Sequence, residues 1–243
     1  MGEIRCDNRT ASALVLLSGG QDSTTCLYWA TRRYGRENVS AIGFDYGQRH
    51  IEELKCAQAI CNDLGVHFEV LALPAVNSIT ENALTRAEIP VDIASVIATK
   101  PKDDGSDLSP VPPNTLVEGR NLLFLTYAAI YAKSKEIKTL VTGVSQTDFS
   151  GYPDCRDVFI KSANVTLNLG LDYPFVIETP LMWLDKAQVW ALAQELGVLN
   201  VIKEKTLTCY NGITGTGCGN CPACTLRRRG YEGFIKESTV CTN

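Results

Sequence analysis

Residues 18–23 have the types and spacing of a loop that binds phosphate. They read Ser-Gly-Gly-Gln-Asp-Ser and lie between an apolar run and a stretch with helical periodicity. Paired glycines permit positive φ angles and close approach of a ligand to the backbone, and the N–H groups at a helix N-terminus attract anions. The spacing of the common P-loop, with its lysine, is missing. We therefore expect a different kind of cradle for a phosphate chain, with an ordinary Gly-Gly turn as the alternative.

Four cysteines near the C-terminus form the second group with chemical potential. Cys209 is followed by Cys218, Cys221 and Cys224, with eight residues in the first gap and two in each of the others. Thiolates at this spacing suit a tetrahedral Zn²⁺ site, and the glycines on either side of Cys218 allow tight turns. An iron–sulfur cluster is the competing interpretation, but the ferredoxin run has a fourth cysteine where this chain continues with Thr-Leu-Arg. We expect one structural zinc ion per chain.

Further candidates lie where expected strands end or expected helices begin. Lys186 falls in the first turn of an expected helix, where a cation and the helix dipole would reinforce each other near an anion. The other segments are residues 44–50 (Phe-Asp-Tyr-Gly-Gln-Arg-His), 119–121 (Gly-Arg-Asn) and 147–156 (Thr-Asp-Phe-Ser-Gly-Tyr-Pro-Asp-Cys-Arg). Ligands bind at the carboxyl edge of open α/β sheets, although each segment also fits an ordinary capping turn.

The elements that position these segments alternate between strand and helix. Strands are expected at residues 13–17, 39–44, 67–71 and 139–142, and helices at 23–34, 52–64, 121–135, 158–169 and 185–196. Such alternation is typical of an α/β fold with a doubly wound, mostly parallel sheet covered on both faces. In the last helix, Asp185 and Gln188 match a capping box, and Gly197 is placed to end the helix.

Length and composition limit the organisation and the partners of the chain. With 243 residues, 45% of them hydrophobic, the chain can bury one sizeable core. We expect an α/β domain over residues 11–200 and a zinc-binding region over residues 201–243 packed on it. The irregular residues 74–119 are expected to form a lid over the active site.

Ten cysteines without a signal-peptide pattern favour the reducing cytoplasm. No apolar run approaches the roughly 20 residues that cross a bilayer, so no membrane span is expected. A formal net charge of −4 gives no overall attraction to a polyanion, and nucleic acid is not expected as the direct substrate.

Residues 18–23 resemble the Ser-Gly-Gly-x-Asp-Ser loop of the PP-loop ATP pyrophosphatase superfamily, which has an adenine nucleotide alpha-hydrolase-like fold. That resemblance implies that the loop binds the β and γ phosphates of ATP and that ATP is cleaved between its α and β phosphates. Ser18 and Ser23 would then donate to phosphate, and Asp22 would hold Mg²⁺ or a bridging water. Lys186, behind Thr-Pro-Leu at residues 179–181, resembles the distal lysine with which these enzymes hold pyrophosphate.

Together these motifs resemble the 7-cyano-7-deazaguanine synthase family of queuosine biosynthesis, from about Leu14 to Gly230. The resemblance implies that 7-carboxy-7-deazaguanine and ammonia are joined at the expense of ATP to give the nitrile preQ0, in a homodimer. Catalytic roles would fall to Asp22, Ser23, Lys186 and Arg120, with Arg120 on the carboxylate or its activated form. The implied ATP-binding segment consists of Leu17, Ser18, Gly19, Gly20, Gln21, Asp22, Ser23, Thr24, Thr25, Cys26 and Leu27. The implied deazaguanine pocket consists of Asp148, Tyr152, Asp154 and Arg156, and the four cysteines match the zinc ligands of the family.

The chemistry of a carboxylate requires activation before ammonia can replace its oxygen. We expect adenylation, displacement of AMP to give an amide, and a second adenylation on the way to the nitrile, with free ammonia as the nitrogen donor. Three alternatives stay open: a PP-loop enzyme that modifies tRNA directly, a relative that stops at the amide or transfers the activated deazaguanine elsewhere, and a zinc-dependent adaptor with a decayed ATP fold. The intact loop residues Ser18, Asp22 and Ser23 argue against the adaptor.

Overall fold

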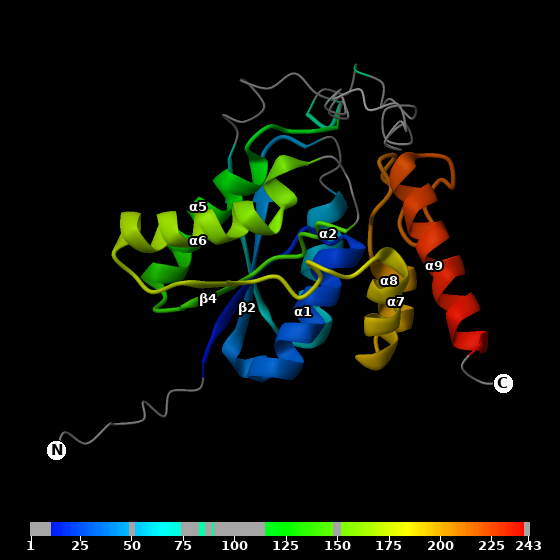
Figure 1. The fold of residues 1–243 in the computed structure, drawn as a ribbon, viewed down its shortest axis with the longest axis horizontal. Coiled ribbons are helices and arrows are strands. Elements are labelled where there is room, and N and C mark those ends of the chain that lie inside the picture. The colour runs from blue at the N-terminus through cyan, green and yellow to red at the C-terminus, as the bar shows by residue number, and fades with distance from the viewer. Residues whose placement is uncertain are drawn as a thin grey trace, which may run out of the picture.

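The computed structural model describes residues 11–48, 52–73, 83–85, 89, 115–147 and 152–240. Strands and helices alternate along this part of the chain (Figure 1). In order they are β1 (Ala13–Leu16), α1 (Gln21–Tyr34), β2 (Val39–Asp45), α2 (Glu52–Leu64), β3 (His67–Ala72), α5 (Arg120–Ser134), β4 (Thr139–Val141), α6 (Asp157–Leu171), β5 (Val176–Glu178), α7 (Lys186–Glu195), α8 (Leu199–Lys205) and α9 (Pro222–Val240). Short 3₁₀ helices cover Arg36–Asn38 and Pro153–Cys155.

The five strands form one parallel sheet in the order β3-β2-β1-β4-β5. The strand order reverses direction between β1 and β4, since the chain first builds outward through β2 and β3 and then returns to the other side of β1. Helices cover both faces, with α5 and α6 on one and α1 and α2 on the other (Figure 1). The expected doubly wound α/β fold is confirmed.

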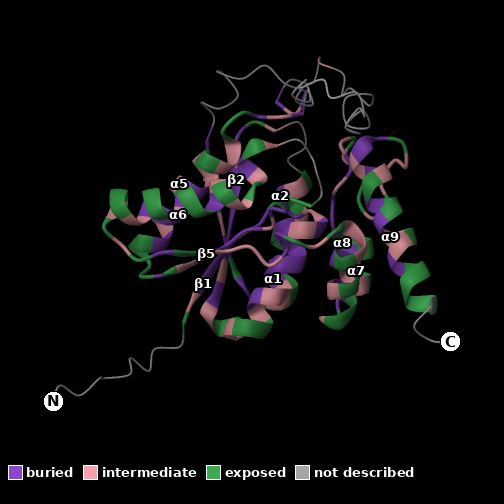
Figure 2. Ribbon diagram, viewed as in Figure 1, coloured by how far each residue is buried: buried purple, intermediate pink, exposed green. Residues whose placement is uncertain are grey.

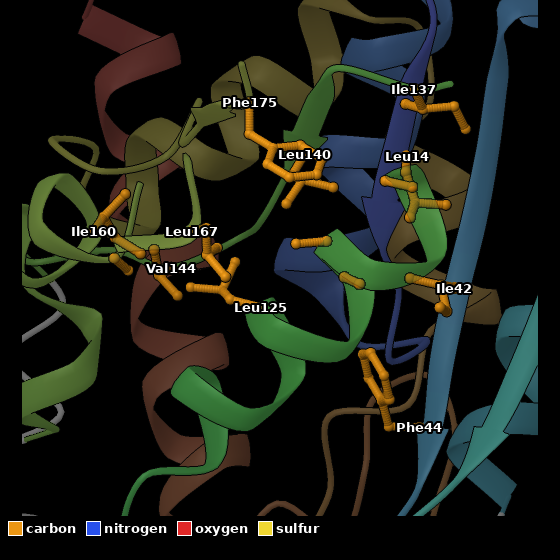
Figure 3. Close-up of a cluster of buried hydrophobic side chains, with 14 of the residues drawn as sticks. Leu14, Ile42, Phe44, Leu125, Ile137, Leu140, Val144, Ile160, Leu167 and Phe175 are labelled. Atoms are coloured by element: carbon orange, nitrogen blue, oxygen red, sulfur yellow. The ribbon is translucent and has the colours of Figure 1, made fainter. Parts of the chain in front are cut away.

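The core lies on both faces of the sheet because successive side chains of a strand point to opposite faces. On β1, Leu14 packs with α5 and α6, and its neighbours Ala13 and Val15 pack with α1 and α2. All three are fully buried, as are most residues of the central strands (Figure 2). Figure 3 shows the first of these clusters, in which Leu140 and Phe175 lie close together.

Helices α7, α8 and α9 form a third packed group at one side of the sheet (Figure 1). Trp190 of α7 and Phe234 of α9 are both buried in it. Gly230 allows α9 to lie against α7, because a Cβ at that position would come within 2.4 Å of the Cβ of Lys186. The expected boundary after residue 200 falls inside α8, which belongs to this group.

The predicted ends of α7 are confirmed, but three other elements were not predicted. The capping box of Asp185 and Gln188 is present, and Gly197 has a φ of +75° after α7. The short strand β5 and the helices α8 and α9 were not expected from periodicity. Most of the expected lid, residues 74–119, lies outside the described residues. Within the described part of the chain, no helix is long and apolar enough to cross a membrane.

Candidate active site and metal centre

The phosphate loop joins the end of β1 to the start of α1. Gly19 has a φ of +87°, and a Cβ there would lie 2.2 Å from the backbone carbonyl oxygen of Glu53, so only glycine fits. The hydroxyls of Ser18 and Ser23 lie 3.0 Å apart, and the Ser18 N–H donates to the Ser23 hydroxyl at 3.2 Å. These contacts fold the loop back on the first turn of α1, and the N-terminus of a helix favours an anion.

Asp22 and Lys186 form an ion pair across the loop. The Nζ of Lys186 donates to Oδ2 of Asp22 at 2.7 Å. The lysine side chain keeps only 12% of its surface exposed, and the aspartate side chain keeps 33%. The other carboxylate oxygen of Asp22, Oδ1, is buried and has no hydrogen-bond partner within the described residues. A buried, unpaired carboxylate oxygen is costly unless a cation or a donor meets it, so Asp22 fits a ligand of Mg²⁺ or of a bridging water.

A pocket of about 370 Å³ opens beside this ion pair. It lies at the carboxyl ends of β1, β2 and β4, where the strand order reverses and where open α/β sheets bind ligands. From the expected ATP segment, the residues that line it are Leu17, Ser18, Gly20, Gln21, Asp22 and Ser23. Thr24 and Thr25 are fully buried, and Cys26 and Leu27 pack in the core.

One wall of the pocket is aromatic. The rings of Phe44 and Phe124 stack with centroids 4.3 Å apart, and the ring of Tyr46 lies 5.4 Å from that of Phe124. Arg120 also lines the pocket and donates to the Tyr46 hydroxyl at 3.4 Å. Burial alone would lower the pKa of Arg120, but the nearby hydroxyls of Tyr46 and Tyr152 raise it above its usual value. Arg120 is therefore a cation beside a flat apolar surface.

The residues expected to bind deazaguanine occupy different places. Tyr152 lines the pocket, and its hydroxyl shares a 2.7 Å hydrogen bond with Thr115. Asp154 is buried and accepts a hydrogen bond from the backbone N–H of Asn121 at 3.0 Å, so it caps the N-terminus of α5. Arg156 is exposed and donates to the carbonyl of Pro153. Asp148 lies outside the described residues.

Cys155 also lines the pocket, where it accepts a hydrogen bond from the side-chain amide of Asn121. Burial and the nearby carboxylate of Asp154 raise the pKa of its thiol to about 11. The thiol is neutral at physiological pH, and a neutral thiol is a poor nucleophile. Cys155 therefore contributes a neutral side chain to the wall of the pocket.

The four C-terminal cysteines meet in space. Their sulfur atoms lie within 4.8 Å of one another. Backbone N–H groups point at the sulfurs, from Cys218 to Cys209, from Cys221 to Cys218 and from Cys224 to Cys221. Such donors stabilise thiolates, and four convergent sulfurs are the ligand set of a structural zinc ion. The arrangement therefore fits a bound metal.

The cysteine cluster touches the phosphate loop through two residues that follow α8. The N–H of Leu207 donates to the carbonyl of Gly19 at 3.0 Å, and the hydroxyl of Thr208 accepts from the N–H of Gln21 at 3.4 Å. Arg227 of α9 holds Thr208 in turn, with a 2.9 Å hydrogen bond. The segment that carries the four cysteines is thus part of the support of the loop.

Arg227 has a structural role at the end of α8. It is buried, donates to backbone carbonyls of α8 and stacks 5.3 Å from the ring of Trp190. It caps the C-terminus of α8, where the helix dipole favours a cation.

Sequence reasoning did not single out several residues that line the pocket. Tyr210 directly follows Cys209, and Glu53 lies in the first turn of α2 with no motif around it. Burial raises the pKa of the Glu53 carboxyl to about 7, an effect that the nearby guanidinium of Arg120 partly offsets.

Comparison with known proteins identifies the relatives of this arrangement. A family model described as "Queuosine biosynthesis protein QueC" matches residues 12–235. The chain belongs to this family. Two relatives named 7-cyano-7-deazaguanine synthase are similar over most of their length. One from Clostridium acetobutylicum is 58% identical over 91% of this chain and 94% of its own, and one from Clostridium botulinum is 55% identical over 93% and 96%. A solved structure of an NH3-dependent NAD synthetase from Campylobacter jejuni aligns with a TM-score of 0.44 and 15% identity, over 80% of this chain and 69% of the other.

Proposed function

We propose that this protein is a carbon–nitrogen ligase that converts 7-carboxy-7-deazaguanine and ammonia to 7-cyano-7-deazaguanine at the expense of ATP, in queuosine biosynthesis. Membership of the QueC family and the two relatives with this name support the proposal. The observation that carries it within the site is a single pocket. That pocket joins the phosphate loop and Lys186 to a flat aromatic wall with a cation, Arg120.

The loop end of the pocket would take ATP. The N–H groups of the first turn of α1, the hydroxyls of Ser18 and Ser23 and the ammonium of Lys186 would hold the β and γ phosphates. Asp22 would hold Mg²⁺, which when bound neutralises charge on the phosphates. These groups hold two phosphates as a unit, so they would stabilise pyrophosphate as the leaving group and leave the α phosphorus open to attack.

The aromatic end of the pocket would take the deazaguanine. A planar heterocycle packs well against Phe124 and Tyr46, and the guanidinium of Arg120 matches a carboxylate in charge and geometry. Tyr152 supplies a hydroxyl at the same end. We infer that Asp154 acts indirectly, by fixing the first turn of α5 and hence Arg120.

The reaction would proceed in two similar halves. A carboxylate oxygen attacks the α phosphorus of ATP, which gives an acyl adenylate and pyrophosphate, and ammonia then displaces AMP to give the amide. The amide oxygen attacks a second ATP, and loss of the second AMP leaves the nitrile. The side chains and backbone amides contribute positioning and charge stabilisation.

The four cysteines would hold one structural Zn²⁺, whose binding energy stabilises the fold of residues 206–224. A tetrathiolate site without an open position has no room for a substrate, so zinc takes no part in this chemistry. We place the enzyme in the cytoplasm, where ATP and reduced thiols are available.

We infer a homodimer that forms through α6. Val158, Val165 and Leu169 are 62%, 60% and 79% exposed and follow one another at spacings of seven and four residues, so they share one face of the helix. Exposed apolar side chains that gather on one face of an outer helix are typical of an interface between protein chains. The net charge of −4 argues against nucleic acid as the direct substrate.

The proposal is tested by incubating the protein with 7-carboxy-7-deazaguanine, ATP and ammonium and identifying the products by mass spectrometry. We expect the nitrile together with two AMP and two pyrophosphate for each nitrile formed. With ¹⁸O in the carboxylate, the label should enter AMP. Label in inorganic phosphate with ADP as the nucleotide product would overturn the adenylation route, and a product that stops at the amide would overturn the nitrile assignment. Modification of tRNA in place of the free base would favour the direct tRNA enzyme.

A further inference from the structure

Glu53 faces the pocket from an element that the proposed roles do not yet use. It lies in the first turn of α2, and its backbone carbonyl packs against Gly19, so the start of α2 is fixed to the phosphate loop. The residue lines the same pocket as Arg120 and Asp22, and its carboxyl group interacts electrostatically with Arg120. The preceding residue, Glu52, is exposed and forms an ion pair with Lys55.

The proposed reaction needs a base that the other groups do not supply. Ammonium is the predominant form of ammonia at neutral pH, and it has no lone pair with which to attack carbon. Of the described residues that line the pocket, two are carboxylates, Asp22 and Glu53. Asp22 is held by Lys186, and the thiol of Cys155 is already protonated. Glu53 is the carboxylate that stays available for proton transfer.

We propose that the Glu53 carboxylate receives ammonium in the pocket and removes one proton from it, which delivers ammonia to the activated carboxyl carbon. This inference rests on the proposed function. The nitrogen lone pair forms the C–N bond, and the bond from carbon to the phosphate oxygen breaks with its electron pair going to AMP. Glu53 keeps the first proton and later loses it to solvent, and the second proton that nitrogen loses passes to water.

The surroundings of Glu53 suit this role. Burial raises the pKa of its carboxyl to about 7, and Arg120 of α5 partly offsets that rise. Among the described residues, Tyr46, after β2, and Cys56, on α2, also interact electrostatically with Glu53. A base works best when its pKa lies near the working pH, because it is then ionised yet still basic enough to accept a proton.

The decisive experiment measures kcat/KM for total ammonium between pH 6 and pH 9, with ATP and 7-carboxy-7-deazaguanine saturating. If Glu53 deprotonates bound ammonium, the wild-type value should be nearly constant above about pH 7.5 and fall below pH 7. Glu53→Gln should be slow near neutral pH and gain tenfold for each pH unit, because it would depend on free ammonia. A wild-type profile that itself gains tenfold for each pH unit up to pH 9 would overturn the proposal, as would a Glu53→Gln profile of wild-type shape.

Hydroxylamine provides a second measurement that separates proton transfer from structure. It is neutral near pH 7 and needs no base before it attacks. Glu53→Gln should form the hydroxamate at a rate within a few fold of wild type while losing most nitrile formation from ammonium, and Glu53→Asp should regain part of that loss. Equal losses with both nucleophiles would assign Glu53 a structural role and overturn the proposal.

Glu52→Gln is the matched control and should behave as wild type. If wild type itself gave no hydroxamate, the proposed function would fail, not the role of Glu53.

Discussion

At the scale of single residues, the ion pair between Asp22 and Lys186 links two segments that lie 164 positions apart in the sequence. We expect Asp22→Ala and Lys186→Ala to fold normally and to lower turnover by about 10²–10³-fold, because both groups act on phosphate charge and neither fills the core. Steady-state kinetics together with thermal unfolding would check this.

The control for that prediction is another ion pair of the same length. The Nζ of Lys205 lies 2.7 Å from a carboxylate oxygen of Asp63, and both side chains are more than half exposed. Lys205→Ala should leave turnover unchanged and have little effect on stability, because water screens an exposed ion pair. Near-normal turnover in Asp22→Ala or Lys186→Ala would remove that residue from the site.

The raised pKa of the Glu53 carboxyl also leads to a prediction about stability, which is independent of catalysis. The pKa of its carboxyl is raised from 4.5 to about 7 in the folded protein, so folding favours the protonated form. The stabilisation that this gives is complete below pH 4.5 and is lost as the pH rises through 7. Glu53→Gln, which stays neutral, should exceed wild type by about 1 kcal/mol at pH 5 and by about 3 kcal/mol at pH 8. Urea unfolding at the two pH values measures the difference, and a difference that does not grow with pH would contradict it.

At the scale of elements, hydrophobic periodicity predicted most of the strands and helices. The helix over Glu52–Leu64 was predicted with both of its ends, and β1, β2 and β3 were found to within a residue. Strands β1 and β2 lie inside the sheet, where burial enforces a clear pattern, and the edge strand β3 is six residues long. Strand β5 was missed because its three residues at the edge of the sheet are too short to show alternation.

Helix α9 was missed for a different reason. It contains Gly230 and Gly233, which disfavour helix in isolation. In the folded protein Gly230 permits the close approach of α7, and packing therefore overrides propensity. The site shows the same limit. The motif that contains Asp154 was recognised from the sequence. The role of Asp154 as the cap of α5 depends on a contact with Asn121, and sequence spacing does not reveal that contact.

The contact between the cysteine cluster and the phosphate loop gives a prediction at this scale. Purified protein should be colourless with about one zinc per chain, and Cys221→Ser should lose zinc and stability together. Loss of zinc should also speed amide hydrogen exchange in residues 19–21, since Leu207 and Thr208 hold that segment.

Cys56 is a suitable control for the metal, because it packs against the same cluster but is not one of the four convergent cysteines. Cys56→Ser should keep its zinc and its exchange rates. A brown protein with stoichiometric iron would identify an iron–sulfur cluster instead. Unchanged exchange in residues 19–21 after loss of zinc would show that the loop stands without the metal.

At the scale of the whole molecule, the two sides of the sheet serve different purposes. The group formed by α7, α8 and α9 brings Lys186 and the support of the phosphate loop to the carboxyl edge of the sheet. On the opposite side, α5 carries Arg120 into the pocket with its first turn, and α6 packs outside it. The outer face of α6 is therefore free to serve assembly without disturbing the site.

That division predicts the oligomeric state and how it can be changed. The wild-type protein should have twice its chain mass of 26.5 kDa in light scattering after size-exclusion chromatography. The double variant Val165→Glu, Leu169→Glu should be a monomer, because each apolar side chain buried at an interface contributes about 1.5–3 kcal/mol and a buried unpaired carboxylate opposes association.

Ile235→Glu is the control, since Ile235 is also exposed (44%) but lies on α9, at the far side of the molecule from α6 (Figure 1). It should remain dimeric. A dimer that survives the double variant would place the interface elsewhere, and a monomeric wild type would refute self-association through α6.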